Sequence, residues 1–112
     1  MEESILISIK KLLGIPAEYT NFDTDIIIHI NTVFMVLNQL GVGPEEGFRI
    51  EDDSATWEDY IPDEAPKLDA VKSYIYLKVK LVFDPPLSGT VAAAINQSIN
   101  EYEWRLNVQA NS

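Results

Sequence analysis

The sequence predicts an all-α fold of about four helices, roughly residues 3–13, 24–40, 67–83 and 89–107, with a long acidic loop at about 42–66. Apolar residues recur at helical spacing in four segments, and glycine or proline follows the first three. The period-two alternation of strands fails even where β-branched residues are most frequent. A length of 112 residues is typical of one domain, so we expect residues 1–112 to form a single unit.

The first predicted helix has Ile5, Ile9 and Leu12 at helical spacing. Two lysines near its end suit the negative pole of the helix dipole. Gly14 and then Pro16 form a stop signal, because glycine readily adopts the left-handed conformation that ends helices and proline cannot continue one.

The second predicted helix contains "DIIIHINTVFMVLNQLG", which is too long for one strand. Asp23 or Thr24 is the expected N-cap, and Gly41 is typical of the residue after a helix. Apolar residues cover most of its circumference, and one stripe is expected to face the other helices: Ile26, Ile30, Val33, Leu37 and Leu40. The surplus is expected to meet either the third helix or a neighbouring subunit: Ile27, Ile28, Met35 and Val36.

The acidic loop holds half of the chain's eighteen acids, between Glu45 and Glu64, against the single base Arg49. Glycines and prolines interrupt any long element there. Within it, "SATWEDYI" is compatible with one or two helical turns capped by Ser54. Because the connection is too long for a tight turn, we expect it to be either functional or mobile.

The last two predicted helices form a hairpin, as the first two do. Leu68, Val71 and Ile75 begin the apolar line of the third helix, which Asp84-Pro85-Pro86 ends. The fourth helix is capped near Ser88 or Thr90, and its tail after residue 108 is expected to fray.

Composition restricts the class of protein. The net charge of −10 opposes non-specific binding to nucleic acid, which depends on neutralising phosphates with Lys and Arg. With no cysteine, disulfides and thiolate zinc sites are excluded. No apolar run is long enough for a membrane span, and the acids at the start are unlike a secretory signal, so a soluble protein made in the cytoplasm is expected.

No catalytic, cofactor or metal site is expected. His29 is the single histidine and has no partners for a nucleophilic triad, so we interpret it as a boundary side chain of the fold. The acids from Asp52 onward lack the glycine and the terminal glutamate of a calcium loop. "GVGPEEG" lacks the lysine and hydroxyl residue of a phosphate loop.

Aromatic residues are the remaining candidates for function. Most aromatic side chains at helical spacing belong to a core, and the others are typical interface anchors. Trp57, Tyr60 and Trp104 are therefore hypothetical interface residues, with the core as the alternative for each.

Six segments in order resemble the small head-tail connector, or adaptor, proteins of long-tailed bacteriophages and prophages of Gram-positive bacteria. They are "SIKKLLGI", "DIIIHIN", "NQLGVGPEEGFRI", "TWEDYI", "VKSYIYLKVKLVFDPP" and "EYEWRLNV", and the most specific parts are "YIYLKVKLVFDPP" and "EWRLN". The resemblance runs from about Ser8 to Val108 and implies a mostly helical virion subunit without catalytic residues.

The resemblance also implies partners. Such subunits form a closed ring, commonly of about a dozen copies, which docks beneath the portal, extends the DNA channel and presents a platform to the next connector or tail-completion protein. DNA would pass nearby without specific binding, and no membrane is involved. An acidic lumen would repel phosphates, and our hypothesis places Glu51, Asp52 and Asp53 there.

Two other function classes remain open at this stage. An acidic DNA mimic or regulatory protein would occupy a basic site on a host protein, and the acidic excess suits it. However, a mimic needs acids at phosphate-like spacing over its surface, and here they cluster in one segment. A small enzyme is disfavoured because no catalytic constellation is present.

Overall fold

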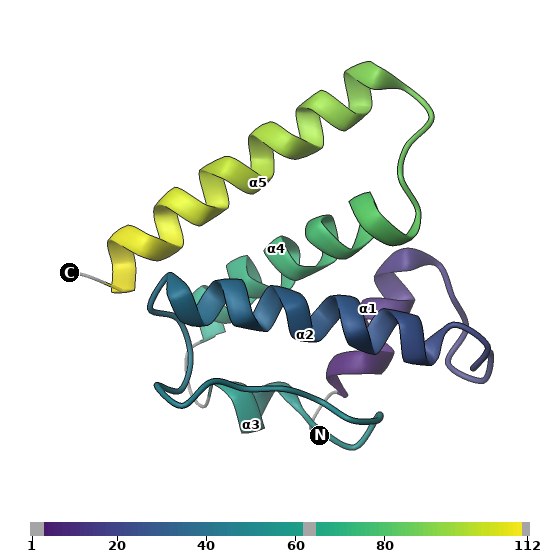
Figure 1. The fold of residues 1–112 in the computed structure, drawn as a ribbon, viewed down its shortest axis with the longest axis horizontal. Helices are drawn as coiled ribbons and strands as arrows, with labels where there is room; N and C mark the ends of the chain where they lie inside the picture. Colours follow the sequence, from purple (N-terminus) through teal and green to yellow (C-terminus); the bar gives the residue numbers. More distant parts are fainter. Residues whose placement is uncertain (1–3, 62–64, 111–112) are drawn as a thin grey trace.

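The computed structural model describes residues 4–61 and 65–110, which form five helices and no strand (Figure 1). The all-α prediction is confirmed, and the additional helix is a single turn within the acidic loop. The helices are α1 (Ile5–Leu13), α2 (Asp23–Gln39), α3 (Trp57–Tyr60), α4 (Ala65–Phe83) and α5 (Gly89–Ala110).

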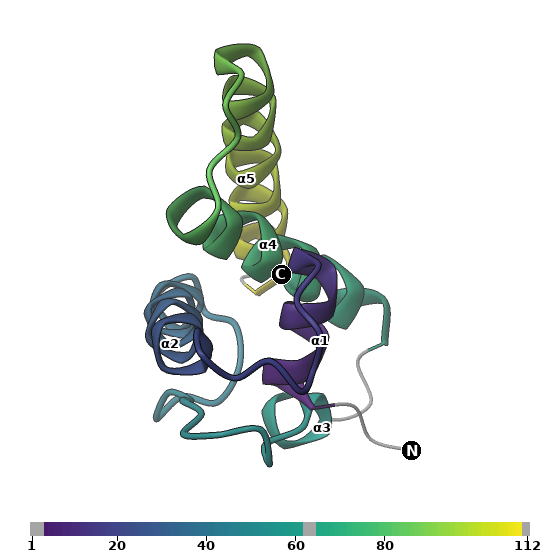
Figure 2. The same cartoon turned by 90° about the vertical axis from the view of Figure 1, so that its right-hand side faces the viewer.

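Helix α4 is the central element of the fold. Helix α5 lies on one side of α4, α1 and α2 lie on the other, and α3 lies beyond them (Figure 2). Buried side chains recur along α4 at intervals of three and four, which is the spacing that one helical face requires: Val71, Tyr74, Ile75 and Val79. The expected hairpin of α4 and α5 is present, whereas α1 and α2 pack more on α4 than on each other.

Several helix ends match their sequence signals. Gly14 and Gly41 have φ of 84° and 88°, the left-handed conformation expected after α1 and α2. Ser88 caps α5, since its hydroxyl accepts a hydrogen bond from the Val91 N–H at 3.3 Å. The tail expected to fray after residue 108 is helical to Ala110.

The predicted caps of α2 and α3 are wrong, since neither Asp23 nor Thr24 caps α2 and Ser54 does not cap α3. Helix α2 follows Phe22, which makes no side-chain cap, and the Asp23 carboxylate pairs with Lys10 instead. Helix α3 is capped by Thr56, which forms a capping box with Asp59. Ser54, the expected cap of α3, donates to an acid of the loop.

Lys10 is completely buried and fixes the connection between α1 and α2. Its ammonium lies 3.1 Å from the Ala17 carbonyl oxygen, 2.7 Å from the Tyr19 carbonyl oxygen and 2.8 Å from the Asp23 carboxylate. The two carbonyl oxygens accept hydrogen bonds from the ammonium, and the carboxylate supplies the opposite charge. A buried charge is tolerated only when it is paired in this way.

Three aromatic rings join α2 to the chain that follows it. Phe34, Phe48 and Tyr60 form a triangle with ring centroids 4.6 to 5.2 Å apart. Gly43 lies against this cluster with φ of 88°, and a Cβ added there would come within 2.6 Å of the Tyr60 ring. Two constraints therefore require glycine at position 43: the positive φ of its backbone, and the Tyr60 ring, which leaves no room for a Cβ.

We predict that Lys10→Met destabilises the protein by about 3 kcal/mol, because it leaves the Asp23 carboxylate without its cation and two carbonyl oxygens without donors. The loss of stability is smaller than for a completely buried ion pair, because Asp23 is itself partly exposed to solvent. Urea unfolding followed by circular dichroism measures the change. Lys11→Met at the neighbouring exposed lysine is the matched control and should stay within about 0.5 kcal/mol of the parent chain.

Candidate functional site

The candidate site consists of surfaces, and the first is the acidic loop on the face away from α4. Asn31 of α2 holds this loop, because its side-chain amide donates to the Ile50 carbonyl oxygen at 2.9 Å and accepts from the Ile50 N–H at 2.8 Å. Seven residues further along α2, Asn38 donates to the carbonyl oxygens of Pro44 and Glu45 at 3.0 and 3.3 Å. Two turns of one helix face thus fix the backbone of the loop.

The far end of the loop is fixed to α1. The Ile5 N–H donates to the Ala55 carbonyl oxygen at 3.0 Å, beside an isolated β-bridge between Ser4 and Thr56. The Trp57 indole N–H donates to the Ser8 hydroxyl at 2.8 Å. The loop is therefore part of the packed structure at both ends, and its acids between residues 45 and 59 are exposed.

The three candidate channel acids are consecutive and exposed at the tip of this loop. Ser54 donates to the Asp52 carboxylate from its hydroxyl at 2.5 Å and from its backbone N–H at 2.8 Å. These hydrogen bonds lower the pKa of Asp52, so its carboxylate stays charged well below neutral pH. Glu51 and Asp53 flank it and are equally open to solvent, so the tip presents negative charge.

The second surface is the outer side of α2. Ile28 and Met35 lie one above the other there and are more than half exposed. Ile27 and Val36 are half-buried and pack against the core. The four additional apolar side chains of α2 are therefore divided: Ile27 and Val36 complete the core, and Ile28 and Met35 remain exposed.

The three aromatic residues predicted as interface candidates also differ in exposure. Trp57 and Tyr60 are each 3% exposed and belong to the core, so in this conformation they offer almost no surface to a partner. Trp104 of α5 is 67% exposed. An exposed tryptophan is a typical interface anchor, because a partner that covers it removes a large apolar area from water.

Helix α5 is attached to the body through its inner side. Tyr74 of α4 is fully buried and donates from its hydroxyl to the Glu103 carboxylate at 2.7 Å. Burial, and then this carboxylate, raise the pKa of the Tyr74 phenol above its ordinary value, so it remains a donor. At the end of α5, Asn107 donates to the Leu40 carbonyl oxygen at 3.3 Å. These polar contacts fix the rotation of α5, and hence the direction in which Trp104 points.

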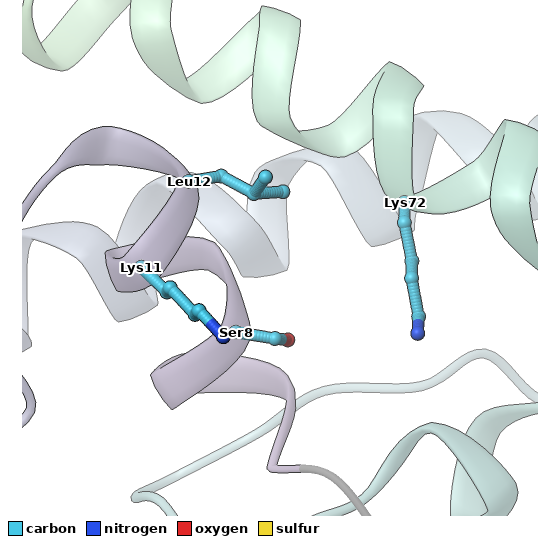
Figure 3. Close-up of a pocket in the computed structure, with 4 residues that line it drawn as sticks. All are labelled: Ser8, Lys11, Leu12 and Lys72. Atoms are coloured by element: carbon cyan, nitrogen blue, oxygen red, sulfur yellow. The ribbon is translucent and has the colours of Figure 1, made fainter.

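An open hollow of about 440 Å³ lies between α1 and α4, lined by Ser8, Lys11, Leu12 and Lys72 (Figure 3). The Lys72 ammonium also lies over the Trp57 ring, 5.3 Å from its centroid. The Ser8 hydroxyl donates to the Ile5 carbonyl oxygen and accepts from the Trp57 indole, so it joins Trp57 to the backbone of α1. Among the described residues that line the hollow, no acid or histidine accompanies this hydroxyl.

The described part of the chain shows neither a metal-binding cluster nor a membrane-spanning helix. No group of three or more His, Asp or Glu side chains there is arranged to hold a metal ion. Among residues 4–61 and 65–110, no helix combines the length and the apolarity needed to cross a membrane. His29 lies half-buried on α2.

Sequence reasoning missed the residues that build the loop. The sequence alone assigns no role to Asn31 and Asn38, and it indicates for Lys10 only a favourable charge near a helix end. The spacing of seven residues between Asn31 and Asn38 could have indicated a shared role, because it places both side-chain amides on the same face of α2. Helical spacing places Lys10 nearer the apolar side of α1 than Lys11, because Lys10 follows Leu6 by four residues and precedes Leu13 by three, but nothing in the sequence indicates its pairing with Asp23.

Comparison with known proteins gives one family. The family model described as phage connector protein matches residues 5–112. That match includes every helix of the structure, from the start of α1 onward. Comparisons with curated proteins and with solved structures gave no significant match.

We predict that Asn31→Ala releases the acidic loop from α2, because both hydrogen bonds to Ile50 are lost and the buried backbone of Ile50 is left unpaired. Hydrogen exchange at the Ile50 amide should accelerate by about 10-fold or more, a change of at least about 1.4 kcal/mol. Thr32→Ala on the exposed side of α2 is the control. Equal exchange in both variants would show that Asn31 does not hold the loop.

Proposed function

Because this chain belongs to the phage connector protein family, we propose that it is a structural virion protein whose copies form a ring between the portal and the tail. The family makes it a phage protein that contacts other head or tail proteins, and the match over residues 5–112 is the observation that carries the assignment. In our proposal the ring extends the DNA channel and presents a docking platform to the next connector or tail-completion protein. The role is non-catalytic and needs no cofactor.

The exposed apolar side chains of the subunit support assembly. Ile28 and Met35 on α2, and Trp104 on α5, each remain more than half exposed in a single copy. Leu87, in the α4–α5 connection, is completely exposed. Apolar side chains at this exposure are typical of protein–protein contact sites when they group on a surface. A head-to-tail contact that closes on itself gives a ring.

The acidic loop supports a place beside the DNA. The tip at Glu51, Asp52 and Asp53 is anchored at both ends and projects three exposed carboxylates, which would repel the phosphates of a passing duplex. We therefore propose that these acids line the lumen of the ring. Residues 1–112 would act as one unit, which assembles in the host cytoplasm and remains in the virion.

The alternative of an acidic DNA mimic has less support. A mimic presents charge along a continuous surface, whereas the exposed sides of α2 and α5 carry mostly apolar and neutral polar residues. Binding of the isolated chain to a basic host protein, lost as salt rises, would favour the mimic.

We predict that deletion of the gene in its parent phage gives filled heads without tails, or heads that lose DNA, because the portal would lack its platform. Electron microscopy of lysates and a plaque assay measure the result, with complementation from a plasmid as the control. Normal infectious particles after deletion would contradict the proposed function.

We predict that the combined variant Glu51→Gln, Asp52→Asn and Asp53→Asn slows or reduces DNA ejection, because the duplex loses repulsion from the channel wall. Ejection from purified particles can be followed with a DNA dye at fixed ionic strength. The matched control is Glu18→Gln, Glu45→Gln and Glu46→Gln, three exposed acids whose loss changes the net charge equally, from −10 to −7. If both variants eject DNA like the parent, the lumen assignment is wrong.

A further inference from the structure

Helix α5 carries an outward face with no net charge along its length. At intervals of three and four residues, this face consists of Thr90, Ala93, Gln97, Asn100, Trp104 and Val108, all exposed. Glu101 lies on the same side, four residues after Gln97 and three before Trp104, and it pairs with Arg105, so that it adds no net charge. We call this line the α5 face.

The segment that begins this face is unusual for the chain. Residues 85–100 contain no Asp, Glu, Lys, Arg or His, although 23% of the chain is Asp, Glu, Lys or Arg. Most of these sixteen residues are exposed, and Ile99 is the only one that is fully buried. An exposed helix normally carries charges that solvate it. Their absence from an exposed segment indicates a surface that a partner covers.

A second face, which is uncharged, lies on α2. Ile28, Thr32, Met35 and Gln39 follow one another at intervals of four, three and four, and all four are exposed. No Asp, Glu, Lys or Arg occurs in residues 26–44. We call this line the α2 face.

The two faces cannot meet within one copy. Helices α5 and α2 pack on opposite sides of α4, and each exposes the side turned away from the body (Figures 1 and 2). A contact between them must therefore join two molecules. Because the surfaces differ, such a contact is head-to-tail and propagates from copy to copy, as a ring requires.

The charge of the chain identifies a second copy as the occupant. Two molecules of net charge −10 repel each other, and the repulsion acts over a Debye length of about 8 Å at physiological salt. Copies can approach with least opposition where neither surface carries net charge. Depletion of charge is also what distinguishes the centre of a protein interface from its rim. The α5 and α2 faces meet that condition, and the acidic loop does not.

We propose that the α5 face of one copy packs on the α2 face of the next copy, with Trp104 as its anchor. This inference rests on the proposed ring and names the surfaces that build it. The α5 face extends over nineteen residues, about 27 Å, and the α2 face over twelve, about 16 Å, so the α5 face is long enough to cover the α2 face. The Cys-free sequence allows a direct test by cross-linking.

The test uses phage particles that carry Thr32→Cys and Gln97→Cys in the same chain, one thiol on each face, treated with a short bismaleimide. Denaturing gels probed with an antibody to the chain should show a ladder of joined copies, because each molecule then links to two neighbours. Each single variant should give no more than a weak dimer. Thr32→Cys with Glu51→Cys is the control pair and should give no ladder.

The outcomes separate the inference from the function on which it rests. A strong dimer from Gln97→Cys alone would show α5 against α5, and a ladder from the control pair would show the acidic loop against α2. Either result overturns the proposed contact, as does the absence of a ladder in particles that contain the chain. Particles that contain no copy of the chain at all would overturn the proposed function as well.

A second measurement does not depend on cross-linking. Trp104→Ala should weaken ring formation with portal by about 10-fold or more while leaving the melting temperature of the single chain unchanged, because Trp104 is mostly exposed. Leu12→Ala is the matched control, since Leu12 is half exposed on α1 and lies on neither face. Equal assembly of the Trp104 variant and the parent chain would overturn the role of the α5 face.

Discussion

Every other long helix of this protein must pack on α4. Helix α4 contacts α1 and α2 on one side and α5 on the other, so it is apolar around much of its circumference. Helix α5 has only this one neighbour along most of its length, and its inner side supplies Ile99 and Leu106 to the core. Within residues 4–61 and 65–110, no further helix covers the outer side of α5. The exposed Trp104 follows directly from that shortage.

Polar residues of α2 hold the backbone of the acidic loop, which has no strand to pair with among the described residues. Its apolar stripe enters the core, and Asn31 and Asn38 on the adjoining side replace the strand pairing that the loop backbone lacks. Buried backbone N–H and C=O groups need partners, and a side-chain amide offers both a donor and an acceptor. A loop held in this way can present three consecutive acids at a defined place. A freely moving chain would spread the same charge over a large volume.

The distribution of charge relates these packing facts to the proposed assembly. Acids gather on the loop, while residues 26–39 of α2 carry no Asp, Glu, Lys or Arg and the exposed Glu101 of α5 is paired with Arg105. Between identical acidic molecules, a neutral surface is where apolar contact outweighs repulsion. The same subunit can then attract its neighbours through two helix faces and repel DNA through one loop. Neither role requires a catalytic group, and the side chains around the hollow between α1 and α4 supply none.

The sequence by itself determined the helices and their ends where the signals are local. Apolar periodicity gave the four long helices, and Gly14, Gly41 and Ser88 end or cap them as expected. Tertiary structure alone decided which side chains are buried, paired or exposed. Lys10 is buried, whereas its neighbour Lys11 is exposed. Asp23 pairs with Lys10 although its position predicts a cap of α2. Trp57 lies in the core, whereas Trp104 is exposed. Periodicity and capping depend on neighbours within about four residues, whereas burial depends on contacts between residues far apart in the chain, such as Ser8 with Trp57.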